Sequence, residues 1–287
     1  MSGGSSITPL LGGARTPATA ANRARNALGA GGDRAERWAC ARDHAWRLLD
    51  RHVPWDARVA VLGAGNGHDL PLGRLAARAG QVDLFDLDLA ALRRARRGCL
   101  PEVRRRIGIH RCDVTAGIAD RIARAVRLGR RPQLRSGAPR PVGSGDYHVV
   151  IGDLLYSQLL YPALLDAGVP GNRTRDALAL HGPAITHAVV SRMHASAADD
   201  GRIIHLHDVV GWWDGRPQPT SLEEILAQVR LEDAFALISL CRQPVGTDPR
   251  ASALRLGARV IDTALWEWPF ASDARYLVCA TVTERGK

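Results

Sequence analysis

The 287-residue sequence is poor in aromatic residues and lysine, and it lacks the cysteine spacing of a metal site. Its five cysteines form no C-x-x-C pair, which favours a reduced compartment over a disulfide framework and predicts no zinc or iron–sulfur centre. No run approaches the roughly 18 apolar residues of a membrane span, and no apolar signal core opens the chain. We therefore expect a cytoplasmic protein with no membrane partner. The sequence carries no indication of oligomeric state.

Two segments about twenty residues apart predict a nucleotide-binding βαβ unit. The first, RVAVLGAGNGHDL, is an apolar run that ends in a glycine-rich turn, where the backbone can approach a ligand with no Cβ in the way. The second, QVDLFDLDLAAL, is an apolar run that ends in two acids, and an acid in that place accepts hydrogen bonds from ribose hydroxyls. The residues that define the pattern are Gly63, Gly65, Gly67, Asp86 and Asp88.

The spacing of the glycines distinguishes between nucleotides. A dinucleotide fingerprint has its third glycine where this chain has His68. The G-x-G-x-G spacing seen here, with the acidic strand after it, resembles the class I S-adenosylmethionine-dependent methyltransferases, and in particular a poorly characterised bacterial group. A nicotinamide or flavin enzyme is the alternative. One departure concerns Val61, which stands where the family usually has an acid, and we expect Asp69 to supply part of the lost polarity.

The resemblance implies an α/β fold: a Rossmann-like, doubly wound, mainly parallel seven-stranded sheet with an antiparallel C-terminal strand and helices on both faces. After the first two strands, five further runs are interpreted as strands. These are Arg106–Val114, Tyr147–Asp153, Arg202–Val210, Ala258–Trp268 and Tyr276–Thr283. Helices are expected over Arg34–Arg51 and Thr174–Ala198.

The predicted domain organisation is simple. Residues 1–33 are rich in small residues and are expected to be a disordered tail, followed by a single methyltransferase domain over 34–287. Within that domain we expect an N-terminal lid helix over 34–57, a basic crossover and loop over 116–146, and a substrate-side insertion with a helix over 211–257.

The resemblance also implies a cofactor site for S-adenosyl-L-methionine. Asp86 is assigned to the ribose hydroxyls, Asp88 to capping of the following helix, and Asp113 to the adenine amino group. The full set of expected cofactor residues comprises Gly63, Ala64, Gly65, Asn66, Asp69, Asp86, Leu87, Asp113, Val114, Gly152 and Asp153.

Methyl transfer from a sulfonium is an in-line displacement, so the protein must mainly position the acceptor, with a base only where the acceptor arrives protonated. His207 and Asp208 at the end of the fifth predicted strand, and Tyr156 after the fourth, are the candidate catalytic residues. The alternative for His207 is a histidine satisfied in the sheet–helix layer, and for Tyr156 a packed aromatic. No metal is expected.

The acceptor is expected to be a small molecule, in bacterial specialised metabolism. Gln158, Trp212 and Trp213 are candidate substrate contacts, with the tryptophans as a wall for a planar, apolar group, whereas Trp266 and Trp268 are expected to pack the late hairpin. The loop after the fourth strand lacks the Asn/Asp-Pro-Pro-aromatic run typical of enzymes that methylate base amines.

Two alternatives stay open. The net charge of +10 is concentrated between Arg93 and Arg140, which hold fifteen arginines and three acids. Such a segment is either a solvated face, which we favour because it lies away from the predicted reaction centre, or the docking surface of an RNA methyltransferase. Val61 in place of an acid suggests the second alternative, a non-catalytic cofactor-binding scaffold.

Overall fold

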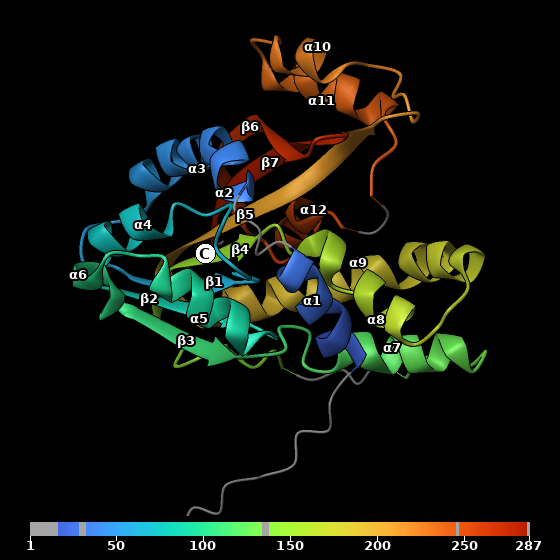
Figure 1. Ribbon diagram of the computed structural model, residues 1–287, viewed down its shortest axis with the longest axis horizontal. Coiled ribbons are helices and arrows are strands. Elements are labelled where there is room, and N and C mark those ends of the chain that lie inside the picture. The colour runs from blue at the N-terminus through green and yellow to red at the C-terminus, as the bar shows by residue number, and fades with distance from the viewer. Residues whose placement is uncertain (1–16, 29–32, 134–137, 245–246, 286–287) are drawn as a thin grey trace, which may run out of the picture.

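The computed structural model describes residues 17–28, 33–133, 138–244 and 247–285. Within these ranges seven strands form one sheet, in the order β3-β2-β1-β4-β5-β7-β6 (Figure 1). β1 to β5 run parallel to one another, and β7 lies antiparallel between β5 and β6. The strands are β1 (Arg58–Leu62), β2 (Gln81–Asp86), β3 (Ile107–Arg111), β4 (Tyr147–Asp153), β5 (Ala197–Trp213), β6 (Arg259–Ala271) and β7 (Ala274–Glu284).

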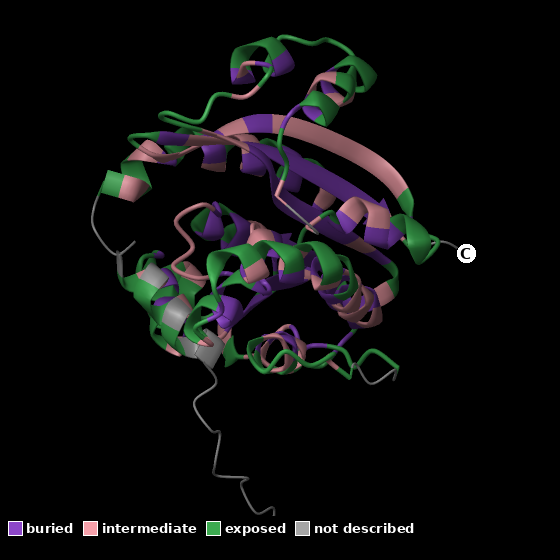
Figure 2. Cartoon of the chain, turned by 90° about the vertical axis from the view of Figure 1, so that its right-hand side faces the viewer, coloured by how far each residue is buried: buried purple, intermediate pink, exposed green. Residues whose placement is uncertain are grey.

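The central strands are apolar along their length because both of their faces are covered. In β1, Val59 and Val61 face one hydrophobic core while Ala60 and Leu62 face another, and all four are fully buried. This alternation follows from the two-residue period of a strand, and burial on both faces is typical of a parallel sheet. Figure 2 shows the sheet buried between its helical layers.

The helices divide between the two faces of the sheet. The first core is covered by α3 (Ala39–His52), α4 (Leu72–Arg78) and α5 (Leu89–Arg97). The second is covered by α7 (Ile118–Arg127), α8 (Tyr161–Asp166), α9 (Gly171–Ser196) and α12 (Pro249–Arg255). The shorter elements are α2 (Asp33–Arg37), α6 (Pro101–Arg104), the 3-10 helix η1 (Tyr156–Gln158), α10 (Leu222–Leu226) and α11 (Leu231–Leu240).

This arrangement confirms the predicted fold class, including the parallel centre and the antiparallel C-terminal strand. β4 has the predicted bounds, and β3 is shorter than predicted. β5 is longer than predicted because β7 pairs with it as far as Trp213, opposite Ala274. Trp212 and Trp213, expected directly after the fifth strand, are therefore its last two residues.

The predicted disordered tail over residues 1–33 is wrong for part of its length. Residues 17–28 form a helix, α1 (Pro17–Leu28), which contacts α5, α7 and α8 (Figure 1). Composition missed it because α1 is rich in small and polar residues, with no long apolar side chain except Leu28. The rest of that prediction, over 1–16 and 29–32, lies outside the described residues.

The segment predicted as one lid helix over 34–57 consists of α2 and α3, which meet at Trp38. α3 packs on the sheet through Ala41, Ala45 and Leu48, so it is part of the core, and only the α2–α3 junction reaches the cavity described below. Among the described helices, none combines the length and apolar character needed to cross a bilayer.

Candidate functional site

A cavity of about 720 Å³ opens at the carboxyl ends of the parallel strands. Its lining includes the turn after β1 and the residues that end or directly follow β2, β4 and β5, which is where open α/β sheets bind ligands. Ten of the predicted cofactor residues line it, all except Gly152: Gly63, Ala64, Gly65, Asn66, Asp69, Asp86, Leu87, Asp113, Val114 and Asp153.

The turn after β1 requires glycine at its first position. Gly63 has a φ of +80°, and a Cβ built there would lie 2.7 Å from the Cβ of Leu155. The turn then directs the amide of Gly65 at Asp86, whose Oδ2 accepts a 3.1 Å hydrogen bond from it. The glycine turn and the acid of β2 are thus joined into one unit, as the sequence pattern predicted.

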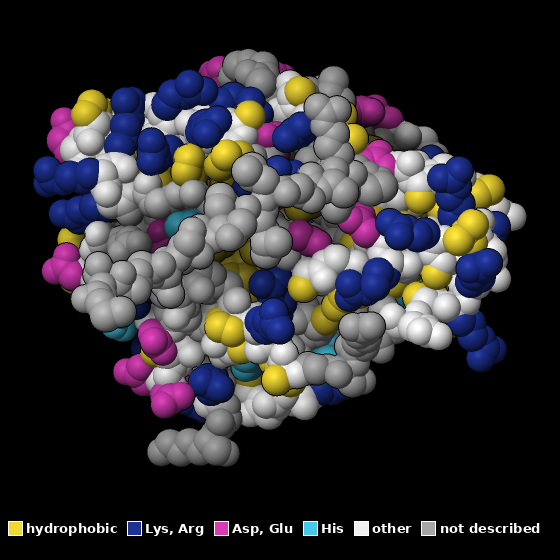
Figure 3. Space-filling model, turned by 90° about the horizontal axis from the view of Figure 1, so that it is seen from below, with side chains coloured by type: hydrophobic (Ala, Val, Ile, Leu, Met, Phe, Trp, Pro, Cys, Tyr) yellow, Lys and Arg dark blue, Asp and Glu magenta, His cyan; other side chains and the backbone are white. Residues whose placement is uncertain are grey.

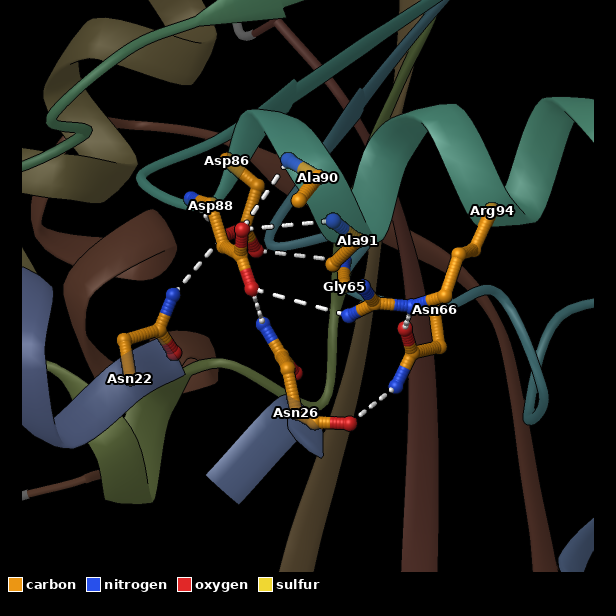
Figure 4. Close-up of polar contacts among 9 residues, drawn as sticks. All are labelled: Asn22, Asn26, Gly65, Asn66, Asp86, Asp88, Ala90, Ala91 and Arg94. Atoms are coloured by element: carbon orange, nitrogen blue, oxygen red, sulfur yellow. Dashed lines mark hydrogen bonds and ion pairs between the residues drawn. The ribbon is translucent and has the colours of Figure 1, made fainter. Parts of the chain in front are cut away.

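Asp88 caps the helix after β2, as the sequence suggested, whereas Asp86 does not (Figure 4). Asp88 is the N-cap of α5, and its Oδ1 accepts hydrogen bonds from the amides of Ala90 and Ala91 at 3.0 and 3.2 Å. Asp86 caps nothing of that helix and lines the cavity instead. Burial raises the pKa of Asp86, although hydrogen bonds from the Asp88 and Gly65 amides oppose the rise.

Two asparagines of α1 reach the same carboxylates, and no motif in the sequence predicts them. Asn22 Nδ2 donates to Asp86 Oδ1 at 2.8 Å, and Asn26 Nδ2 donates to Asp88 Oδ2 at 3.2 Å. Asn66, in the glycine turn, donates from Nδ2 to the backbone carbonyl of Asn26 at 2.9 Å. α1 therefore lies across the end of the cavity at Asp86, which we call the nucleotide end (Figure 4).

Two further buried acids line the cavity. Burial raises the pKa of Asp69 to about 6, although Arg42 and Arg34 oppose the rise. Burial, together with the charges of Asp69 and Asp86, raises the pKa of Asp153 well above its ordinary value. Neither carboxylate oxygen of Asp153 has a hydrogen-bond partner among the described residues. A cationic group in the cavity would favour the ionised form of these acids.

Asp113 lines the cavity, but its carboxylate is hydrogen-bonded within the loop that follows β3. Its Oδ1 accepts from the amide and the hydroxyl of Thr115 at 2.8 and 2.7 Å, and its Oδ2 accepts from the amide of Gly117. The carboxylate fixes the turn after β3 against the cavity and keeps one acceptor position on Oδ2.

The chain after β4 turns sharply beneath the cavity. Leu154 has a φ of +47°, which is uncommon for a residue with a branched side chain and marks a constrained turn. Gln158, a predicted substrate contact, ends η1 and lines the cavity, and Asp208, within β5, lines it too.

Tyr156 and Gly152 are not where the sequence placed them. Tyr156 is 2% exposed, and its hydroxyl lies 2.6 Å from Nδ1 of His205 in the core beneath the cavity. A Cβ at Gly152 would lie 2.4 Å from that hydroxyl, so Gly152 is needed to admit the tyrosine. The prediction of a catalytic Tyr156 is corrected to the packed alternative, because the residue turns away from the cavity wall.

The prediction of a catalytic His207 is also corrected. It lines a second, smaller cavity of about 430 Å³ with Phe235, Arg250 and Cys279, and not the cavity that holds Asp86 and Asp208. Burial lowers the pKa of His207 to about 4 and that of His205 to about 3, so both rings are neutral near pH 7. Alternate residues of a strand face opposite sides of the sheet, which explains why Asp208 reaches the first cavity and His207 does not.

Five aromatic side chains form a wall at the β5–β7–β6 side of the cavity. All five line it, and each ring centroid lies within 6.4 Å of at least one other ring of the set. We call this set the aromatic wall; its members are Trp38, Trp213, Trp268, Phe270 and Tyr276.

The tryptophan predictions are correct in part. Trp213 belongs to the aromatic wall, but Trp212 donates its indole N–H to the Thr220 carbonyl at 3.0 Å and packs outside the cavity. Trp266 packs in the core as expected. Trp268, expected to pack the hairpin, packs in the core and also lines the cavity.

The insertion over 211–257 contributes little to the cavity. α10 and α11 pack on the β5–β7 side of the sheet around Val210, Ile225 and Leu277, away from the other helices (Figure 1). Only Arg216 and Pro244, among its described residues beyond Trp213, line the cavity.

Several arginines of the Arg93–Arg140 segment are used inside the fold. Arg94 donates to Asn66 at 3.0 Å, and Arg104 and Arg106 donate to backbone carbonyls at 2.7 to 3.2 Å. On the face drawn in Figure 3 the basic side chains are spread out, with hydrophobic and other side chains between them. The loop predicted around 135–145 lies partly outside the described residues, which omit 134–137.

Comparison of the chain with known proteins adds structural neighbours. No family model matches the sequence, and no curated protein matches it. Three solved structures with similar arrangements are a proposed methyltransferase from Bacillus halodurans, a proposed RNA methyltransferase from Pyrococcus horikoshii and an S-adenosylmethionine-dependent methyltransferase from Methanosarcina mazei. Their identities are 9%, 14% and 10%, and their TM-scores 0.46, 0.44 and 0.45. The matches cover 84%, 86% and 84% of this chain and 98%, 84% and 98% of the others.

Proposed function

We propose that the chain is an S-adenosyl-L-methionine-dependent methyltransferase that acts on a small molecule. The single observation that carries the proposal is the unit formed by the glycine turn and Asp86, in which the Gly65 amide holds the carboxylate at the edge of a 720 Å³ cavity. The sequence resemblance named above supports the same nucleotide. The sheet order supports it as well, because the cavity opens where the strand order reverses between β1 and β4.

The residues present fit the cofactor. Asp86 would accept the ribose hydroxyls, and the turn from Gly63 to Asn66 has the small side chains and free space that close approach requires. Asp69 and Asp153 would face the cationic end of the molecule, which explains why buried acids with raised pKa values line this cavity. Asp69 would then supply the carboxylate that the family usually has at the position of Val61. The cofactor, when bound, supplies an electrophilic methyl group.

The protein itself positions the acceptor molecule and, where the acceptor arrives protonated, supplies a proton acceptor. Gln158 and Asp208 line the same cavity and would hold an acceptor in line with the methyl group. Asp208 replaces His207 as the proposed proton acceptor, because it is the residue of that pair that lines this cavity.

A small molecule is favoured over RNA by the shape of the acceptor end. The aromatic wall gives the cavity flat apolar surfaces, and the basic side chains are spread out on the face drawn in Figure 3 instead of forming one continuous patch. The bacterial, cytoplasmic and specialised-metabolic setting expected from the sequence is part of this proposal.

The proposal is tested by calorimetry with S-adenosylhomocysteine. We expect binding by the unmodified protein and at least about a tenfold loss of affinity for Asp86→Ala, since about 1.4 kcal/mol corresponds to tenfold. Asp200→Ala is the matched control, because Asp200 is an exposed acid at the opposite end of β5. Absence of binding by the unmodified protein would overturn the cofactor assignment, and binding without methyl transfer to any small acceptor would favour the scaffold alternative.

A further inference from the structure

The acceptor end of the cavity has a composition that restricts what it can bind. Four members of the aromatic wall come from neighbouring strand ends: Trp213 from β5, Trp268 and Phe270 from β6, and Tyr276 from β7. The strand order places β5, β7 and β6 on the far side of β4 from β1 and β2. The aromatic wall therefore lies across the cavity from the nucleotide end at Asp86.

Two arginines line the same cavity, and neither forms an ion pair with a described residue. Among the described residues, the guanidinium groups of Arg34 and Arg216 make no hydrogen bond and no ion pair. Arg34 lies over the rings of Trp38 and Phe270, with its Cζ 5.4 and 5.9 Å from their centroids. Arg216 follows Trp213 in a turn and donates its backbone amide to the carbonyl of Trp213 at 2.9 Å.

The arginines decide between charge types of acceptor. A wall of aromatic faces alone would suit a cation, but Arg34 already occupies two of the faces with its own guanidinium. A cationic amine would also meet the positive charge of Arg216. A planar ring that carries a carboxylate fits both the aromatic wall and Arg216. The ring stacks on the wall, and the carboxylate accepts two parallel hydrogen bonds from a guanidinium.

The charge of Arg34 acts on an acid of the protein itself. Arg34 opposes the rise in the pKa of Asp69, so its charge acts at the glycine-turn side of the cavity, where the carboxylate of the cofactor's amino acid would lie. Arg216 is then left for the acceptor.

We propose that the acceptor is a planar aromatic carboxylate, with its ring on the Trp213–Phe270–Tyr276 part of the aromatic wall and its carboxylate on Arg216. The inference rests on the proposed function, since it names the substrate class of that same site.

The test measures acceptor binding to protein saturated with S-adenosylhomocysteine. The probes are para-hydroxybenzoate and a two-ring hydroxynaphthoate, the neutral isostere para-hydroxybenzamide, and the cation tyramine. We expect at least one acid to bind about tenfold more tightly than the amide and tyramine to bind weakest. Tighter binding of the amide or of tyramine, or no binding of either acid at millimolar concentration, would overturn the inference.

Variants identify the residues responsible. Arg216→Ala should remove the preference for the acid over the amide, and Arg216→Lys should retain part of it, because a single charge replaces a two-pronged donor. Arg230→Ala, at an exposed arginine outside the cavity, should leave the preference unchanged. A preference that survives Arg216→Ala would contradict the assignment.

The ring contact is tested separately. Trp213→Ala should weaken the acid and the amide alike, and Trp213→Phe should restore both, whereas Trp55→Ala, at a tryptophan that is 70% exposed and outside the cavity, should change neither. Binding of S-adenosylhomocysteine is measured first in every variant. If the unmodified protein does not bind S-adenosylhomocysteine, the proposed function is contradicted. If it binds S-adenosylhomocysteine but neither acid, only the present inference is contradicted.

Discussion

Asn22 Nδ2 donates a 2.8 Å hydrogen bond to Oδ1 of Asp86, the carboxylate oxygen that also accepts from the Asp88 amide at 2.8 Å. The other oxygen accepts from the Gly65 amide at 3.1 Å. An oxygen that already accepts two hydrogen bonds has little capacity for a third. A ribose hydroxyl that binds Oδ1 must therefore replace the amide of Asn22, and α1 competes with the nucleotide for the carboxylate.

Removal of this competing amide should strengthen nucleotide binding. We expect Asn22→Ala to tighten S-adenosylhomocysteine binding about fivefold to tenfold, since a hydrogen bond of about 1 kcal/mol no longer has to be broken. Titration calorimetry measures the change directly. Arg23→Ala is the control, because Arg23 is an exposed residue of the same helix. Weaker binding by Asn22→Ala would mean that Asn22 assists the nucleotide instead of competing with it.

Nucleotide binding should depend on pH through Asp69. The pKa of this acid is raised to about 6 by burial, so it is mostly protonated below that pH. A cationic ligand binds the ionised form, and its affinity should fall by up to about tenfold per pH unit as the pH drops below 6. Calorimetry in buffers of different ionisation enthalpy should show proton release on binding near pH 6.

Asp69→Asn supplies the comparison for that pH series. The neutral side chain should weaken binding at pH 8 and remove the steepest part of the pH dependence. It should also lower the pKa of Asp153, because the charge of Asp69 contributes to raising it. An unchanged pH profile in Asp69→Asn would assign the titration to another group.

The glycine turn should be sensitive to substitution at one position and tolerant nearby. Gly63→Ala places a Cβ 2.7 Å from that of Leu155 at a φ of +80°, and we expect a loss of about 2 kcal/mol or more in the free energy of unfolding. Gly73→Ala, in α4, meets no atom within 4 Å and should be neutral or stabilising by up to about 1 kcal/mol. Urea denaturation of the two variants tests the pair, and equal stabilities would contradict the steric account.

The sequence predicted those parts of the site that are local in the chain. The glycine turn, Asp86 and Asp88 lie within one βαβ unit, where spacing fixes which residues meet. The aromatic wall is not local, because antiparallel pairing of β6 with β7 brings Phe270 and Tyr276 beside Trp213. The alternation of apolar and polar residues in the sequence does not predict which residues of β5, β6 and β7 pair with one another.

The remaining errors have two physical sources. α1 has few apolar side chains, and its described contacts with the nucleotide end run through the amides of Asn22 and Asn26, which composition cannot distinguish from a solvated tail. The sequence offers His207 and Asp208 together as catalytic candidates, but the alternation of the strand decides which of two adjacent side chains reaches a given face.

Tyr156 offers a test of the corrected assignment. Its hydroxyl is the hydrogen-bond partner of Nδ1 of His205, and both residues are buried, so Tyr156→Phe leaves a buried polar atom without that bond. We expect the free energy of unfolding to fall by about 1 to 3 kcal/mol, with S-adenosylhomocysteine affinity unchanged, because the residue lies outside the cavity wall. Urea denaturation and calorimetry on the same preparations separate the two effects. A variant that keeps full stability but loses methyl transfer would return Tyr156 to the catalytic role that the sequence first suggested.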